Sequence, residues 1–232
     1  MRPEDVSGLR ELSLFAGMAD EGFERLSRAA YLQAFPPHVE LFREGDRADF
    51  LFVVVEGTVE LHASWNGRET SMGMVSRNGT FILAAVIRDA CYLMGARTVG
   101  RCRLLMIPAE DVRAAFELDD AFARAIVVDL AGCYRGVIKS QKDLKLRTGV
   151  ERLAAYLLRL AAEQGEEPEV TLPYDKRTLA SLLGMTPENL SRAFATLKPY
   201  GVAVNGASIA ISDREDLGRL AKLSPLIDAP GV

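Results

Sequence analysis

Residues 176–197 read KRTLASLLGMTPENLSRAFATL, with Gly184 between two apolar runs. The apolar residues of each run recur at helical spacing, which predicts two short helices joined by a tight turn at this glycine. Ala180 is small where the two helices must approach each other. Thr186 can cap the second helix, and Pro187 suits its first turn. The stretch therefore predicts a helix-turn-helix.

The start and the outer face of the second predicted helix are polar. Recognition of the DNA major groove requires a helix whose N-terminal end presents polar side chains. Arg192 can bind O6 and N7 of guanine together, and Glu188 can accept a hydrogen bond from N4 of cytosine or hold Arg192 in place. We expect DNA contacts from Lys176, Arg177, Thr186, Glu188, Asn189, Ser191 and Arg192.

A predicted β-hairpin follows the two helices. Residues 201–211 read GVAVNGASIAI, two short strands around Asn205-Gly206. Helix, glycine turn, helix and hairpin in this order are typical of a winged helix-turn-helix. This order favours double-stranded DNA as a partner over the alternative, a purely structural helical hairpin followed by a structural β-hairpin.

The N-terminal half has the pattern of an all-β domain. From Tyr31 to about Pro108, short runs rich in β-branched and aromatic residues alternate with turn signals, of which Asn66-Gly67 is the strongest hairpin signal. Short strands at this spacing predict a small barrel or jelly roll. Before them, residues 13–30 have helical spacing, and Asp20 is placed to cap that helix.

A long helix is predicted from Asp119, where the apolar period changes from two to about three and a half. Its apolar positions follow heptad spacing, which fits either packing on its own barrel or a two-stranded coiled coil between two copies. After a predicted hinge at residues 145–148, residues 150–162 predict an amphipathic helix. The candidate dimer-interface residues are Val127, Leu130, Tyr134, Val137 and Leu144.

Composition excludes several classes of protein. Lys and Arg number 28 against 32 Asp and Glu, so the net charge of −4 gives no global positive field. Three cysteines without a CxxC pair, a charged start and no apolar stretch of about 20 residues predict a cytoplasmic protein without a membrane partner. No Walker loop, GxSxG, HExxH or dinucleotide fingerprint occurs, so we expect no enzyme.

The chain resembles the catabolite-activator/FNR (CRP/FNR) superfamily of bacterial regulators along nearly its whole length. The resemblance is carried by residues 14–17, 41–46, 51–57, 144–160 and 186–192. It implies an α+β fold: a cyclic-nucleotide-binding-like sensor barrel (jelly roll) at 1–118, a dimerisation helix at 119–146 and a winged helix-turn-helix at 147–232. It also implies a homodimer, with RNA polymerase as a candidate partner.

The FNR branch of this superfamily carries Glu-x-x-Ser-Arg in its recognition helix, which Glu188, Ser191 and Arg192 match. That branch reads TTGAT-like half-sites, so the resemblance implies a TTGAT–N4–ATCAA palindrome.

The sensor pocket departs from the cyclic-AMP branch. That branch uses a Phe-Gly-Glu-Leu turn and an Arg-Ser pair to hold ribose and phosphate, whereas this chain has residues 81–84, Phe-Ile-Leu-Ala, and Tyr92-Leu93 in their places. A buried phosphate without a cation is very costly, which argues against cyclic AMP. The pocket would instead be apolar, lined by Leu83, Tyr92, Met94, Val137 and Ile138.

The effector is unknown at this point, and haem is a candidate because the chain is similar to the nitric-oxide-responsive DNR or NnrR branch. His38, His62 and Tyr92 are the candidate axial ligands, with Met94 and Cys91 as further choices. No cysteine precedes Cys91, which argues against an N-terminal iron–sulfur cluster, and no other metal site is expected. The alternatives are a ligand-free scaffold barrel in a constitutive DNA-binding protein, or an enzyme with a regulatory domain of this kind.

Overall fold

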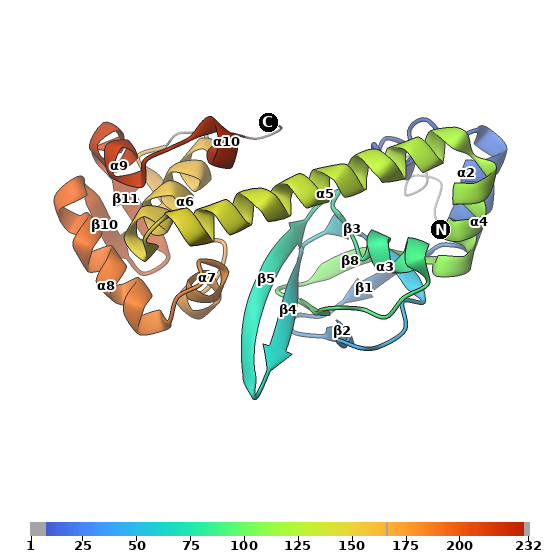
Figure 1. Ribbon diagram of the computed structural model, residues 1–232, viewed down its shortest axis with the longest axis horizontal. Coiled ribbons are helices and arrows are strands. Elements are labelled where there is room, and N and C mark those ends of the chain that lie inside the picture. Colours follow the sequence, from blue (N-terminus) through green and yellow to red (C-terminus); the bar gives the residue numbers. More distant parts are fainter. Residues whose placement is uncertain (1–7, 166, 230–232) are drawn as a thin grey trace. The chain divides into compact units, whose positions relative to one another are not determined.

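The computed structural model describes residues 8–165 and 167–229. Its contacts divide the chain into two units, Met1–Cys133 and Tyr134–Val232 (Figure 1). The division falls within one long helix, α5 (Asp120–Leu146), which contributes its first half to one unit and its second half to the other. The three-part division at residues 118 and 146 stays a prediction.

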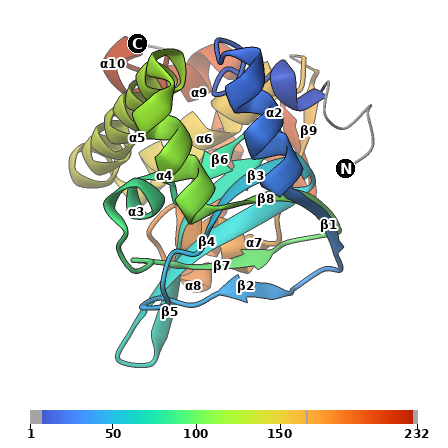
Figure 2. The ribbon, with the colours of Figure 1, turned by 90° about the vertical axis from the view of Figure 1, so that its right-hand side faces the viewer.

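The first unit is built on two four-stranded antiparallel sheets (Figure 2). One sheet has the order β1-β8-β3-β6 and the other β2-β7-β4-β5. The two open sheets form a jelly roll, which confirms the fold class expected from the sequence. The strands are β1 (Tyr31–Phe35), β2 (Glu40–Phe42), β3 (Phe50–Glu56), β4 (Thr58–Trp65), β5 (Arg68–Ser76), β6 (Thr80–Phe81), β7 (Gly95–Thr98) and β8 (Cys102–Pro108).

Helices pack against the sandwich and complete its core. They are α2 (Asp20–Ala29), α3 (Leu83–Arg88), α4 (Ala109–Leu118) and the first half of α5. Strand β3 is central and buries Leu51, Phe52, Val53 and Val54 on both of its faces, which explains its unbroken apolar sequence. Phe122 of α5 is fully buried, and burial of one such side chain stabilises the fold by about 1.5–3 kcal/mol.

Two local predictions for this unit have different outcomes. Asn66 and Gly67 form the two-residue turn of the β4–β5 hairpin, both with positive φ (49° and 72°), as predicted. The predicted cap at Asp20 is wrong by one residue, because Ala19 occupies the N-cap of α2 and Asp20 is the first helical residue. The Ala19 N–H instead donates to Asp119, at 2.8 Å from Oδ2.

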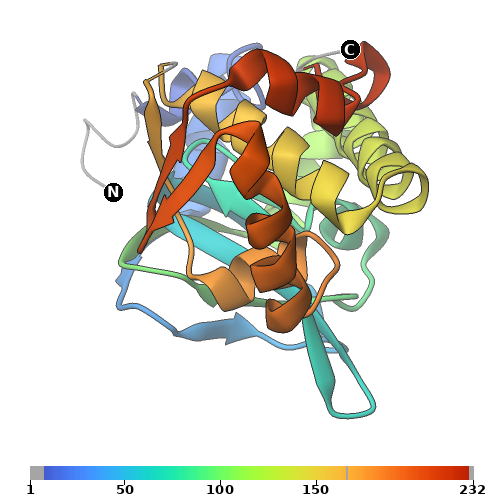
Figure 3. The same cartoon turned by 90° about the vertical axis from the view of Figure 1, so that its left-hand side faces the viewer.

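The second unit combines helices with a three-stranded sheet of order β10-β11-β9 (Figure 3). Its helices after α5 are α6 (Gly149–Glu163), α7 (Lys176–Leu182), α8 (Pro187–Leu197), the 3-10 turn η1 (Lys198–Tyr200), α9 (Arg214–Ala221) and α10 (Pro225–Asp228). The strands are β9 (Glu169–Thr171), β10 (Val202–Asn205) and β11 (Ser208–Ile211). Within the described ranges, no helix is both long and apolar enough for a bilayer.

Candidate DNA-recognition surface and sensor interior

Two side-chain caps define the helix-turn-helix. Asp175 caps α7 by accepting a hydrogen bond from the Thr178 N–H at 2.7 Å, and Thr186 caps α8 by accepting one from the Asn189 N–H at 3.2 Å. Gly184 lies between the helices with φ +62°, a conformation that glycine adopts without steric cost. The capped helix, glycine turn and second helix predicted from the sequence are therefore present.

Helix α8 has one buried face and one exposed face. Its buried face consists of Leu190, Ala193, Phe194 and Leu197, which belong to the core of the second unit. These contacts fix the rotation of the helix about its own axis and leave the opposite face in solvent. All seven residues predicted to contact DNA are exposed: Lys176, Arg177, Thr186, Glu188, Asn189, Ser191 and Arg192.

The surroundings of Glu188 on α8 favour its ionised form. The pKa of Glu188 is lowered by its own backbone N–H, by the Thr186 hydroxyl and by the charge of Arg192, so this carboxylate is an acceptor at neutral pH. Among the described residues, no carboxylate forms an ion pair with Arg192. Its guanidinium is therefore available for an external acceptor such as guanine.

The β10–β11 hairpin forms the wing. Asn205 pairs with Ser208 across the hairpin, so the turn consists of Gly206 and Ala207, one residue later than Asn205-Gly206. Val202 and Ile209 are buried and hold the hairpin against the helices. Strand β9 was not predicted from the sequence, and it extends this sheet by pairing with β11.

Arg152 of α6 is a second feature that the sequence did not reveal. Its guanidinium donates to the backbone oxygens of Arg147 at 2.7 Å and Leu183 at 2.8 Å, with longer contacts of 3.5 Å to Leu144 and Gly184. These oxygens lie at the C-terminal ends of α5 and α7, where helix carbonyls lack partners and carry partial negative charge. Arg152 thus joins the end of α5 to the turn of the helix-turn-helix.

Aromatic rings pack around Tyr92, one of the residues predicted to line the effector pocket. Tyr92 is buried and stacks on Phe42 with 3.9 Å between ring centroids, while Phe52 lies 5.3 Å from Phe42 and 5.1 Å from Phe81. Burial raises the pKa of Tyr92, and its protonated hydroxyl donates to the backbone oxygen of Phe50 at 3.4 Å.

The other residues predicted to line the effector pocket lie partly in the first unit and partly in the second. Leu83 is buried at the start of α3, and Met94 is half-buried before β7. Ile82 precedes α3 with φ +70°, a left-handed conformation that is rare for a β-branched residue and that occurs where the family resemblance expects glycine. Val137 and Ile138 lie in the second half of α5 and are 55% and 40% exposed.

The residues predicted for the dimer interface form an exposed apolar series on α5. Val127, Tyr134, Val137 and Leu144 are 60%, 67%, 55% and 47% exposed, and Leu130 is half-buried. Large apolar side chains that stay in water do not contribute the favourable free energy that their burial would give. Their exposure in a single chain is consistent with a second copy covering this helix.

The candidate haem ligands do not fit a haem in this conformation. His38 is exposed in a left-handed turn with φ +60°, and Tyr92 is held by Phe42 and Phe50. The His62 ring packs against Gly95, where an added Cβ would lie 2.5 Å from the ring, and its Nδ1 lies 3.4 Å from Glu69. The described residues also contain no cluster of three His, Cys, Asp or Glu side chains that could hold a metal ion.

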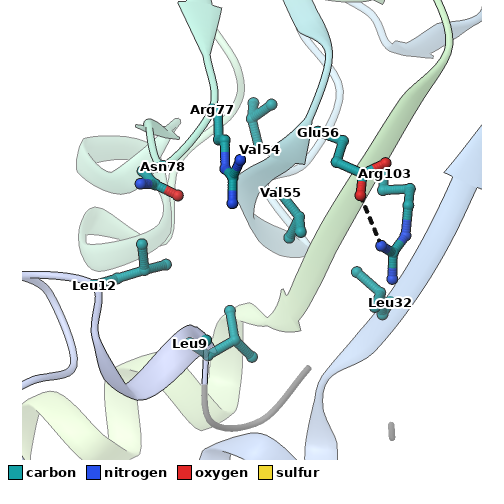
Figure 4. A pocket seen from close by; sticks show the side chains of 10 residues that line it. Leu9, Leu12, Leu32, Val54, Val55, Glu56, Arg77, Asn78 and Arg103 are labelled. Carbon is teal, nitrogen blue, oxygen red and sulfur yellow. Dashed lines mark hydrogen bonds and ion pairs between the residues drawn. The ribbon is translucent and has the colours of Figure 1, made fainter. Parts of the chain in front are cut away.

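A different cavity lies on the outer side of the first sheet (Figure 4). It has a volume of about 210 Å³ and is lined partly by leucines and valines and partly by Arg77, Asn78 and an ion pair of 2.9 Å between Arg103 and Glu56. Leu83, Tyr92 and Met94 do not line it, so this cavity is not the predicted effector pocket.

Comparisons with known proteins agree with this arrangement. A model of the cyclic nucleotide-binding domain matches residues 32–119, and a model of the Crp-like helix-turn-helix domain matches residues 151–220. The chain is 23% identical over 220 residues to the CRP-like cAMP-activated global transcriptional regulator of Mycobacterium tuberculosis, covering 92% of this chain and 98% of that protein. It is 27% identical over 197 residues to the nitrogen fixation regulation protein FixK of Azorhizobium caulinodans, covering 80% and 77%.

Among solved structures, FixK2 from Bradyrhizobium japonicum has a TM-score of 0.73 at 22% identity, covering 84% of this chain and 98% of that one. The named relatives are regulators and not enzymes. The two family models match the two halves of the chain in the order of a sensor domain followed by a DNA-binding domain. The chain therefore belongs to the catabolite-activator/FNR (CRP/FNR) superfamily of transcription regulators.

Proposed function

We propose that this transcription regulator binds a TTGAT–N4–ATCAA-like palindrome as a homodimer in the cytoplasm, with RNA polymerase as its partner at promoters. The observation that carries the proposal is the exposed polar end of α8. Glu188, Ser191 and Arg192 project from the face opposite Leu190 and Phe194, and Arg192 has no ion-pair partner among the described residues. Two copies joined along α5 would present two such helices to two half-sites.

Arg192→Ala tests the proposed base contact. We expect the variant to lose about 1–3 kcal/mol of binding free energy on the palindrome and to lose its preference at the guanine of each half-site. Fluorescence anisotropy with labelled duplexes that differ only at that base pair measures both effects. Lys198→Ala, which removes an exposed charge just beyond α8, is the matched control. An equal loss for Arg192→Ala on every duplex would indicate a phosphate contact and would refute the base contact.

We further propose that the sensor domain does not respond to cyclic AMP. Ile82 and Leu83 stand where the resemblance expects glycine and glutamate, and Tyr92 stands where it expects arginine. An anionic ligand there would have neither a cation nor the ribose acceptor. The effector, if the domain binds one, would therefore be apolar and would have to displace the aromatic rings around Phe42.

A haem titration of the purified protein, followed by absorbance with and without nitric oxide, tests the haem hypothesis. A stoichiometric Soret band that shifts with the gas would support it, although the packing around His62 and Tyr92 must then open. Without a saturable band, haem is removed as an effector. Cyclic AMP is added in parallel, and a rise in DNA affinity with this nucleotide would refute the apolar pocket.

The aromatic packing beside Tyr92 favours one second candidate, a constitutive DNA-binding regulator whose sensor domain is a scaffold. The stacked pair of Phe42 and Tyr92 is the observation behind it. A ligand can shift DNA binding only by its differential affinity for two conformations, and a domain without a ligand site offers no such difference. DNA affinity that stays the same with every effector tested would support this candidate.

A further inference from the structure

The C-terminal segment of the chain, residues 222–229, returns to the junction between α5 and α6. Within the second unit, Lys139 donates from Nζ to the Ala229 backbone oxygen at 2.7 Å. Lys222 forms an ion pair of 2.5 Å with Glu151 near the start of α6. The segment therefore contacts α5 on one side of the junction and α6 on the other.

The centre of these contacts is a buried ion-pair network around Arg147. The Arg147 side chain is 3% exposed, and its guanidinium contacts both carboxylate oxygens of Asp228, at 2.6 Å and 2.8 Å. It also contacts Asp143 of α5 at 2.9 Å and the Lys222 backbone oxygen at 2.9 Å. Asp228 accepts a further ion pair from Arg159 of α6 at 2.8 Å. The Asp228 carboxylate thus connects α6 to the junction, and Arg147 extends the network to Asp143 of α5.

The same junction is connected to the helix-turn-helix through Arg152. Asp228 holds the side chain of Arg147, and the backbone oxygen of the same residue accepts a hydrogen bond of 2.7 Å from Arg152. Arg152 in turn donates to Leu183 at the turn between α7 and α8 at 2.8 Å. A series of short polar contacts therefore leads from the C-terminal segment to the turn that precedes the recognition helix.

We propose that residues 222–229 act as a clasp that fixes the direction of α5 relative to the helix-turn-helix, with Asp228 as the positioning residue for DNA recognition. The proposal rests on the proposed function, in which two copies joined along α5 read two half-sites. The distance between the two recognition helices then depends on the angle that each makes with its own α5. A released clasp loosens that angle while each recognition helix keeps its own base contacts.

Asp228→Asn tests the clasp through spacing. The variant keeps the shape of the side chain and removes its charge. The full-length protein is titrated with the palindrome, with palindromes one base pair shorter or longer between half-sites, and with a single half-site. We expect the wild type to prefer the four-base-pair spacing and Asp228→Asn to lose about tenfold on it, with little change on the single half-site.

Two further variants show what the carboxylate does. Asp228→Glu keeps the charge and should restore most of the spacing preference. Glu215→Gln, which removes an 85% exposed carboxylate from a surface ion pair on α9, is the matched control and should behave as the wild type. An Asp228→Asn variant that loses affinity equally for every duplex, including the half-site, would overturn the proposal, because general destabilisation has that signature.

A second measurement needs no DNA. Amide hydrogen exchange of residues 144–151 and 183–185 should become faster in Asp228→Asn and stay unchanged in Glu215→Gln. Unchanged exchange in Asp228→Asn would overturn the clasp even if the wild type bound no palindrome. A wild type that fails to bind the palindrome, with faster exchange in the variant, would instead refute the proposed DNA site and leave the clasp supported.

Discussion

Replacing Arg152 with methionine removes a buried guanidinium while keeping an unbranched side chain of similar length. In the structure this group donates to four backbone oxygens, two at 2.7–2.8 Å and two at 3.5 Å. The short contacts to Arg147 and Leu183 carry most of the interaction, because hydrogen bonds weaken steeply with distance. Methionine offers no donor, so both oxygens lose a charged partner at a site that is 9% exposed.

The expected magnitude follows from these two bonds. A hydrogen bond to a charged group contributes about 1.5–3 kcal/mol, and a buried acceptor left without a partner costs a similar amount. Some water can reach the site, so the effects do not simply add. We expect Arg152→Met to lower the free energy of unfolding of the second unit by about 3–5 kcal/mol. Domains of this size are stable by only about 5–15 kcal/mol, so the change is large.

Urea unfolding followed by far-UV circular dichroism measures this effect. Arg219→Met is the control, because Arg219 is 65% exposed and its ion pairs are with Glu215 and Asp216 on its own helix. The control should change the unfolding free energy by no more than about 0.5 kcal/mol. A change below about 1 kcal/mol for Arg152→Met would refute the reasoning, since it would mean that the helix ends do not depend on this guanidinium.

Two further predictions concern the same unit. Gly184→Ala places a Cβ 2.7 Å from Leu144 at φ +62°, whereas Gly206→Ala meets nothing within 4 Å at φ +63°. Thermal unfolding should therefore show a strain of about 1–2 kcal/mol in both variants and an extra loss only at Gly184, and equal losses would contradict the contact with Leu144. Lys222 and then the Thr148 backbone N–H lower the pKa of Glu151 from 4.5 to about 2, so its stabilisation is complete above pH 4.5 and is lost as the pH falls towards 2. Glu151→Gln should flatten the stability profile over this window in urea titrations, and parallel profiles for the two proteins would count against the ion pair with Lys222.

Local signals made most of the fold predictable. A glycine turn followed by Thr186-Pro187 is sufficient for a helix-turn-helix, because capping and turn geometry depend on neighbours in sequence. Asn66-Gly67 predicts its hairpin for the same reason. The candidate DNA contacts on and near α8 follow from the pattern of one helical hairpin, and the jelly roll follows from the spacing of short strands, whereas the α+β class was implied by the family resemblance.

Contacts between distant residues were not predictable in the same way. The Asp228 carboxylate meets Arg147 across 81 positions in the sequence, and no local pattern marks either residue as buried. Strand β9 depends on pairing with β11, which is far along the chain. The sensor pocket shows a related limit. Residue types predicted an apolar pocket without a phosphate site, whereas the stacking of the Phe42 and Tyr92 rings could not be read from them.

The anchoring of α5 determines how any signal would reach DNA. Phe122 and Ile126 near its start are fully buried in the first unit, while Asp143 near its end holds Arg147 in the second. Since α5 is one helix, a rotation imposed on its first half would reach its second half in the proposed mechanism through continuous backbone hydrogen bonds. The signal is useful only if the second half cannot turn independently of α8. The Asp228 carboxylate, shared by Arg147 and Arg159, would supply that rigidity. The clasp and the sensor domain would then form one mechanism. A regulator without the Asp228 carboxylate should therefore bind half-sites but lose its response to the sensor domain.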